Sequence, residues 1–106
     1  MNVLFVCSQN RWRSPTAENI CSVYPGIQTR SAGTSPKARI KISRADLNWA
    51  DLIFVMETKH LDYLKRSFAD LMKKKTVRVL HIPDKYQYMD ERLIQLLEAK
   101  LQKYLT

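Results

Sequence analysis

The chain has few of the residues on which small secreted and metal-binding domains depend. Its 106 residues include two cysteines, two histidines and two glycines. A disulfide-stabilised domain normally carries more cysteines, and a structural zinc site needs four clustered ligands, so the composition excludes both classes. We interpret the isolated histidines, His60 and His81, as ordinary non-catalytic residues, and we expect no bound metal.

The sequence also lacks long apolar runs. None approaches the roughly 20 residues that a membrane helix needs, and the first six residues contain no basic leader and no cleavage site for secretion. We therefore expect a cytoplasmic protein without a membrane partner. A length of 106 residues with 45% apolar content fits one domain over residues 1–106.

Basic residues outnumber acidic ones, 18 to 10, which gives a net charge of +8. Such a charge favours anionic partners, namely phosphorylated substrates, nucleic acid or acidic membrane surfaces, but it does not choose among them. We interpret the run Lys73-Lys74-Lys75 as part of a solvated basic surface.

Short apolar runs alternate with amphipathic segments along the whole chain. The apolar runs predict strands at residues 2–6, 27–31, 51–56 and 76–82, and the periodic segments predict helices at 16–24, 43–49 and 61–71 and from Asp90 onward. This alternation predicts an α/β fold, with a three-layer open parallel four-stranded sheet and helices on both faces. In such sheets ligands bind at the carboxyl ends of the strands, so the loop after the first strand is the expected site.

That loop contains a cysteine and an arginine six residues apart, in the sequence Cys7-Ser8-Gln9-Asn10-Arg11-Trp12-Arg13-Ser14-Pro15. Backbone N–H groups in a loop of this length can turn inward to form a nest for a tetrahedral anion, and the N-terminus of the next helix adds positive charge. Arg13 can hold two phosphoryl oxygens, and the Ser14 hydroxyl can donate to the sulfur. We therefore predict that Ser8 to Ser14 bind a phosphoryl group above a thiolate nucleophile, Cys7.

The alternative interpretation makes Cys7 a small buried hydrophobe and the loop arginines solvated charges. It leaves the combination of cysteine, loop, arginine and Ser-Pro unexplained. For Cys21 that interpretation is preferred, because Cys21 lies within a predicted helix and has no arginine six residues further on.

Hydrolysis of a phosphomonoester also needs a proton donor for the leaving oxygen, and Asp84 is the candidate. It follows the fourth predicted strand, and in a parallel sheet it lies at the same edge as Cys7. Pro83 can stiffen the approach, and Tyr86 and Tyr88 are expected to wall a cleft beside it, as is Trp12. The alternative is an ordinary turn aspartate, with Asp90 in reserve as the acid although helix capping explains it.

These residues resemble the signatures of the low-molecular-weight protein tyrosine phosphatases. The stretch Val6-Cys7-x5-Arg13-Ser14-Pro15-x-Ala17-Glu18 is similar to the active-site signature of that family. Three later stretches resemble later motifs of the family: Ser31-Ala32-Gly33-Thr34-Ser35-Pro36, Lys37-Ala38-Arg39 and Ile82-Pro83-Asp84-x-Tyr86. The resemblance covers most of the chain in order, and it implies a flavodoxin-like sheet.

The resemblance also implies roles for individual residues. Cys7 would be the nucleophile, Arg13 the phosphate clamp, Ser14 the stabiliser of the thiolate and Asp84 the general acid and base. Asn10 would brace the loop, and Ser31 would hydrogen-bond Asn10. The implied substrate is a phosphotyrosine protein or a small aryl phosphate, the implied intermediate is a cysteinyl phosphate, and no metal or organic cofactor is implied.

The chain departs from the family pattern at three places. Trp12 stands where a second loop cysteine is usual, Lys85 stands where proline usually follows the acid, and a segment between Pro36 and Lys37 is missing. The missing segment bears on phosphotyrosine specificity more than on phosphatase chemistry.

Two other functions compete with this one. An arsenate reductase shares the fold and the loop, but it needs two relay cysteines, and Cys21 is the only other cysteine here. A non-enzymatic phosphate- or nucleic-acid-binding module fits the charge, but no stacking platform or nucleic-acid motif supports it.

Overall fold

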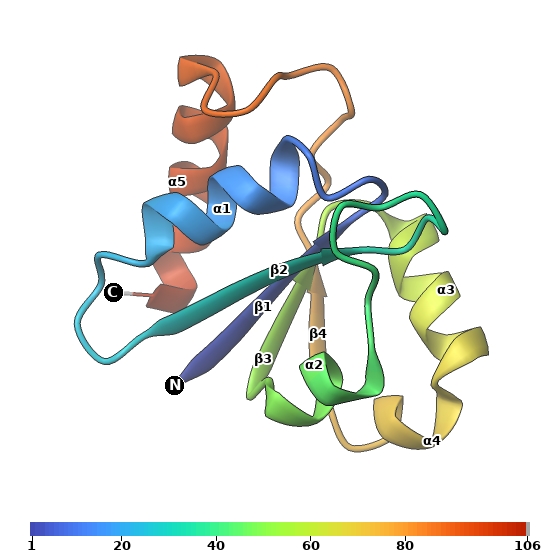
Figure 1. Cartoon of the computed structure of the whole chain (residues 1–106). Helices are drawn as coiled ribbons and strands as arrows, with labels where there is room; N and C mark the ends of the chain where they lie inside the picture. The colour runs from blue at the N-terminus through green and yellow to red at the C-terminus, as the bar shows by residue number, and fades with distance from the viewer. Residues whose placement is uncertain (106) are drawn as a thin grey trace.

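A four-stranded sheet, with every strand parallel, forms the centre of the computed structural model, which describes residues 1–105. The strands are β1 (Asn2–Cys7), β2 (Gln28–Gly33), β3 (Leu52–Val55) and β4 (Thr76–Val79), in the order β2-β1-β3-β4 (Figure 1). β1 has five consecutive buried residues, as expected for a central strand covered on both faces. The predicted parallel four-stranded sheet is confirmed.

Helices cover both faces of this sheet (Figure 1). α1 (Arg13–Cys21) and α5 (Glu91–Leu105) lie on one face, whereas α2 (Arg44–Trp49), α3 (Thr58–Ser67) and α4 (Ala69–Met72) lie on the other. Side chains of β1 alternate between the two resulting cores, because successive residues of a strand point to opposite faces. Phe5 packs in the core under α1 and α5, and Leu4 packs in the core under α2 and α3. The predicted three-layer architecture is therefore confirmed.

The chain changes direction across the sheet at β1. β2 pairs with one side of β1, and β3 pairs with the other. This arrangement makes the carboxyl end of β1 the topological switch point, where open α/β sheets leave a crevice. The Cys7 loop therefore lies at the position where such folds bind ligands.

Two predicted helix starts are confirmed by their capping contacts. Ser43 precedes α2, and its side chain accepts a hydrogen bond from the Asp46 amide at 3.2 Å. Asp90 precedes α5, and its carboxylate accepts from the Arg92 amide at 2.8 Å. Both contacts satisfy amides that have no partner within the helix.

The predicted bounds of the first helix are wrong by three residues at each end. α1 begins at Arg13 rather than at Thr16, so the helix N-terminus lies directly against the loop. It ends at Cys21 rather than at Tyr24, because the Ser22 amide is shared between the carbonyls of Glu18 and Asn19, which tightens and closes the last turn.

Three other elements are shorter than predicted, and one of them is β3, which spans Leu52–Val55 rather than 51–56. β4 ends at Val79 rather than at Ile82, because His81 has φ 57°, a left-handed conformation that cannot continue a strand. The helix predicted over 61–71 is interrupted at Phe68, whose φ of −136° and ψ of 42° separate α3 from α4. Among the described residues, no helix is both long and apolar enough to cross a membrane.

Candidate active site

The candidate site is built around the loop that joins β1 to α1. Cys7 is the last residue of β1 and is buried, and Arg13 is the first residue of α1. The nine-residue α1 therefore directs its N-terminus, with its partial positive charge, at the space above Cys7.

The carbonyl groups of the loop are held by the segment that follows β2. Amides of Thr34, Ser35 and Arg39 donate to the carbonyls of Cys7, Ser8 and Gln9 at 3.0, 3.0 and 2.9 Å. The Arg39 side chain completes the series, with Nε 3.0 Å from the Asn10 carbonyl. With four successive carbonyls bound from outside, the loop amides are left for the interior, which is the arrangement of an anion nest.

Asn10 and Ser14 surround the sulfur of Cys7. Asn10 has φ 56°, which Asn tolerates better than most residues, and its amide nitrogen lies 3.3 Å from Sγ. The other loop amides from Ser8 to Arg13 find no acceptor within residues 1–105. They are therefore available to an oxyanion.

The hydroxyl of Ser14 has one proton, and its neighbours determine where that proton points. Asn10 Nδ2 donates to Ser14 Oγ at 2.9 Å, so this contact uses a lone pair of the oxygen. The Ser14 proton can then go to Cys7 Sγ at 2.9 Å or to the Ala32 carbonyl at 3.4 Å. The shorter contact favours donation to sulfur, as the sequence predicted, and this bond stabilises a thiolate.

The expected hydrogen bond between Ser31 and Asn10 is absent. Ser31 Oγ donates instead to Glu18 Oε1 at 2.6 Å, because the carboxylate is the stronger acceptor and lies on the adjacent helix α1. The buried Asn10 Oδ1 has no partner among the described residues. Asn10 still braces the loop, but through its contacts with Cys7 and Ser14.

Arg13 is buried, with 2% of its side chain exposed, so its charge needs partners. Nη1 donates to Glu57 Oε2 at 2.5 Å and to the Ile82 carbonyl at 2.9 Å, and Nε lies 3.7 Å from Asp84 Oδ1. Burial acts to raise the pKa of Glu57, but the hydrogen bond and charge of Arg13 outweigh it and lower that pKa below its ordinary value. The contacts on Nη1 fix the plane of the guanidinium.

His60 contacts the loop through the side chain of Ser8. Its Nδ1 accepts a hydrogen bond from the Glu57 amide at 3.0 Å, so the ring proton of a neutral His60 is on Nε2, which lies 2.9 Å from Ser8 Oγ. Burial, followed by the positive charge of Arg13, lowers the pKa of His60 to about 4. The imidazole is therefore neutral at pH 7.

A small cavity of about 100 Å³ opens above Cys7. Asp84 lines it and is half exposed, at 49%, and Trp12 lines it with 43% of its surface exposed. The remaining lining residues are Gln9, Arg11 and Arg13. The fold thus brings Cys7, Arg13 and Asp84, the residues chosen from the sequence, to one cavity.

Tyr86 and Tyr88, which we expected to wall a cleft beside Asp84, do not line the cavity above Cys7. Tyr86 packs against the core under α1 and α5, with the Arg92 guanidinium 5.6 Å from its ring centroid. Tyr88 lines a neighbouring groove and accepts a hydrogen bond from Asn19 Nδ2 at 3.2 Å.

Cys21 is buried in the core, as predicted, and burial together with the charge of Glu98 raises its pKa to about 12. It is therefore a protonated core thiol at neutral pH. Residues 1–105 contain no cluster of three or more His, Cys, Asp or Glu side chains able to hold a metal ion.

Solved structures match the fold over nearly the whole chain. The tyrosine phosphatase Wzb from Escherichia coli K30, in complex with phosphate, aligns at a TM-score of 0.79 and 26% identity, over 98% of this chain and 95% of that chain. Over nearly its whole length the chain resembles the low-molecular-weight protein tyrosine phosphatase family. It is accordingly an enzyme of the cysteine-dependent class to which that family belongs.

More distant structures share the fold of this low-molecular-weight phosphatase. A low-molecular-weight protein tyrosine phosphatase from Streptococcus pyogenes has a TM-score of 0.79 at 22% identity, over 98% of this chain and 90% of that chain. The YwlE arginine phosphatase from Geobacillus stearothermophilus has a TM-score of 0.69 at 19% identity, over 96% of this chain and 93% of that chain. No protein-family model and no curated protein sequence matches the chain.

Sequence reasoning missed three residues of this phosphatase site. Glu57 pairs with Arg13, His60 holds Ser8, and Arg39 holds the Asn10 carbonyl. Glu57 and His60 carry a local signal, since they are three residues apart and form a reciprocal cap at the start of α3. Arg39 lies in the motif Lys37-Ala38-Arg39 that resembles the family, but this motif did not indicate its partner, Asn10, which is 29 residues away.

Gly33 offers a test of the contact between β2 and the loop. A Cβ at Gly33 would lie 2.5 Å from the Ser8 carbonyl oxygen and 2.7 Å from Ala38 Cβ, so Gly33→Ala must displace the loop. We expect at least about a tenfold loss of kcat/KM on p-nitrophenyl phosphate, with a loss of stability of about 1–3 kcal/mol.

Gly26→Ala is the matched control for this substitution. Gly26 has φ 77° and open space around it, so alanine strains only a remote turn, at about 1–2 kcal/mol. Urea denaturation and initial rates should show comparable destabilisation for both variants but full activity for Gly26→Ala. Equal activity of the two variants would contradict this account of Gly33.

His60 predicts a specific dependence of stability on pH. Its folded pKa of about 4 lies below the ordinary 6.5, so in this interval the unfolded chain binds a proton that the folded chain does not. Stability should fall as the pH drops from 6.5 towards 4, by roughly 3 kcal/mol in total. The contribution of Glu57, whose pKa is lowered from 4.5, begins to be lost only at the acid end of this window.

The measurement is urea denaturation of the wild type and of His60→Gln at several pH values between 7.5 and 4.5. The variant should show a flatter dependence, because glutamine does not titrate. A variant that loses stability as steeply as the wild type would remove His60 as the cause.

Proposed function

We propose that the chain hydrolyses phosphotyrosine esters, with Cys7 as the nucleophile, Arg13 as the phosphate clamp and Asp84 as the general acid and base. The observation that carries the proposal is the surroundings of the sulfur. Cys7 Sγ receives the Ser14 hydroxyl at 2.9 Å and opens into the one small cavity that Arg13 and Asp84 also line.

In the first step the Cys7 thiolate attacks phosphorus, an S–P bond forms and the bond from phosphorus to the ester oxygen breaks. Nη1 of Arg13 is held by Glu57 and Ile82, so the edge formed by Nε and Nη2 is the one suited to two phosphoryl oxygens. The inward loop amides stabilise the charge that develops on the equatorial oxygens. Asp84 supplies the proton for the leaving oxygen.

In the second step water hydrolyses the cysteinyl phosphate. Asp84, now a carboxylate, accepts a proton from the attacking water, the S–P bond breaks, and the products are inorganic phosphate and the Cys7 thiolate. The Ser14 hydroxyl favours this departure because it donates to the sulfur anion that is released. The cycle balances without a metal or an organic cofactor.

Trp12 and Arg11 favour an aromatic phosphoester as substrate. Both line the cavity above Cys7, and Trp12 offers a half-exposed ring against which a phosphorylated tyrosine can pack. The similar YwlE structure is that of an arginine phosphatase, which makes phosphoarginine the second candidate. The positive charge of Arg11 at the cavity wall disfavours a guanidino substrate, so we propose tyrosine.

The two alternatives from other classes are less well supported. A phosphate-binding module needs only the nest and Arg13. It does not need a carboxylic acid beside the bound phosphate, yet Asp84 lines the same cavity as Cys7 and Arg13. An arsenate reductase needs relay cysteines, and Cys21 is a buried core thiol on the far part of α1.

Cys7→Ser provides the direct test of the nucleophile. It should lower turnover of p-nitrophenyl phosphate and of a phosphotyrosyl peptide by at least about a thousandfold, because a serine hydroxyl in this site is a poor nucleophile. Affinity for inorganic phosphate should stay nearly unchanged, since the amides and Arg13 remain.

The control is Cys21→Ala, which removes the other thiol and should retain full activity. Phosphate release is measured without added metal, and a phosphoarginine peptide is included in the substrate panel. Wild-type protein that binds phosphate but turns over no ester faster than Cys7→Ser would establish the binding module instead.

Asp84→Asn tests the general acid. The variant should lose about a hundredfold or more on alkyl phosphates but only about tenfold on p-nitrophenyl phosphate, because a nitrophenolate leaves readily without a proton. Asp90→Asn removes the same charge near the start of α5, keeps a good helix cap, and should leave both rates unchanged. Equal losses on aryl and alkyl esters for Asp84→Asn would exclude it as the acid.

A further inference from the structure

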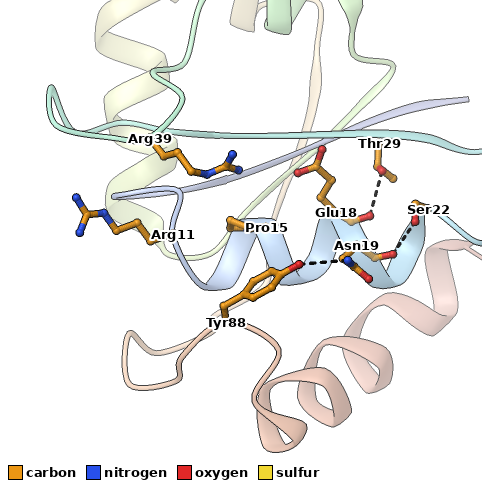
Figure 2. A pocket seen from close by; sticks show the side chains of 8 residues that line it. All are labelled: Arg11, Pro15, Glu18, Asn19, Ser22, Thr29, Arg39 and Tyr88. Atoms are coloured by element: carbon orange, nitrogen blue, oxygen red, sulfur yellow. Dashed lines mark hydrogen bonds between the residues drawn. The ribbon is translucent and has the colours of Figure 1, made fainter.

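A groove of about 620 Å³ lies beside the cavity above Cys7. It runs along the exposed side of α1, with Arg11 at one end and Ser22 and Thr29 at the other (Figure 2). Its volume is in the range of pockets that hold small ligands or short peptide segments, roughly 300–1,000 Å³.

The groove and the cavity above Cys7 share Arg11, which lines both. A substrate whose phosphoryl group lies over Cys7 can therefore extend past Arg11 into the groove. The groove itself lacks the inward-facing amides and the thiol, so it suits a part of the substrate that does not react.

The positive charge at the entrance of the groove has no carboxylate partner. Arg11 is exposed and makes no hydrogen bond or ion pair with residues 1–105, and Arg39 uses Nε on the Asn10 carbonyl. Arg30, Arg44 and Arg92, by contrast, each lie within 3.5 Å of an aspartate. Because neither Arg11 nor Arg39 forms an ion pair with the described residues, their guanidinium groups favour an anionic side chain at this end.

The walls further along offer contacts suited to a peptide. Tyr88 is 48% exposed, and its hydroxyl is held by Asn19 across the groove, so the ring has a fixed orientation (Figure 2). Glu18 adds one negative charge on the opposite wall, but its Oε1 is occupied by Ser31. Two cations against one engaged carboxylate leave the groove positive on balance.

We propose that this groove is a specificity subsite in which Arg11 and Arg39 bind an acidic side chain flanking the phosphotyrosine of a peptide substrate. The proposal rests on the proposed phosphotyrosine phosphatase function and names the class of peptide that the site prefers. Because the two arginines are exposed, the preference is of the size of a surface charge interaction and weakens as salt screens it.

The test uses phosphotyrosyl peptides that differ only in having Glu, Gln or Lys at one of the two positions on either side of the phosphotyrosine. The kcat/KM of the wild type should be about three- to tenfold higher for the Glu peptide than for the Gln peptide at one or more positions, and lowest for Lys. Arg11→Gln should remove this ratio, and Arg11→Glu should invert it in favour of Lys. Arg66→Gln, an exposed arginine of α3, removes the same charge elsewhere and should keep the ratio.

A second measurement separates this proposal from the catalytic one. Binding of the same peptides to Cys7→Ser, measured by fluorescence anisotropy, reports the preference whether or not the wild type turns over any ester. A preference for Glu that depends on Arg11 would support the subsite even if hydrolysis fails. Equal affinities and equal kcat/KM values for Glu, Gln and Lys peptides would overturn the subsite. It would also be overturned if the binding of a small bisphosphate depended on Arg11 while the binding of the peptides did not.

Discussion

The site depends on a hydrogen-bonding constraint: the carbonyl groups from Cys7 to Asn10 must be bound outside the loop so that the amides face inward. Donors from residues 34–39 satisfy all four carbonyls. They can do so because β2 is parallel to β1 and adjacent to it, so both strands end at the same edge of the sheet. Gly33 permits the close approach, since a side chain there would collide with the loop. Parallel pairing thus produces an anion nest.

The electrostatics of the site follow from a buried cation with fixed partners. Arg13 is held by Glu57 and the Ile82 carbonyl, so its plane is set by α3 and by the segment after β4. The same charge contributes to keeping His60 neutral, which fixes the imidazole as a donor to Ser8. Loop shape and charge are therefore coupled through one short segment, Glu57 to His60, at the start of α3.

The short connection after Pro36 shapes the surface beside the Cys7 loop. Arg39 lies six residues after the end of β2, and its side chain donates a hydrogen bond to the Asn10 carbonyl. It is also one of the residues that line the groove along α1. Trp12 contributes an exposed ring to the cavity above Cys7. The proposed chemistry takes place in a cavity of about 100 Å³, and the proposed subsite is a larger adjoining groove that shares Arg11 with it.

Local patterns in the sequence predicted the layers, the parallel sheet and the loop from Cys7 to Ser14, because strand and helix periods and a six-residue spacing are short-range signals. Asp84 was chosen from its position after the fourth predicted strand. Element ends were less predictable: β4 stops early because His81 adopts a left-handed φ. Tertiary structure alone decided the partners, pairing Arg13 with Glu57, Ser31 with Glu18 and Arg39 with Asn10, and directing Tyr88 to the groove. These pairs lie 13 to 44 residues apart, so only the packing of strands and helices brings them together.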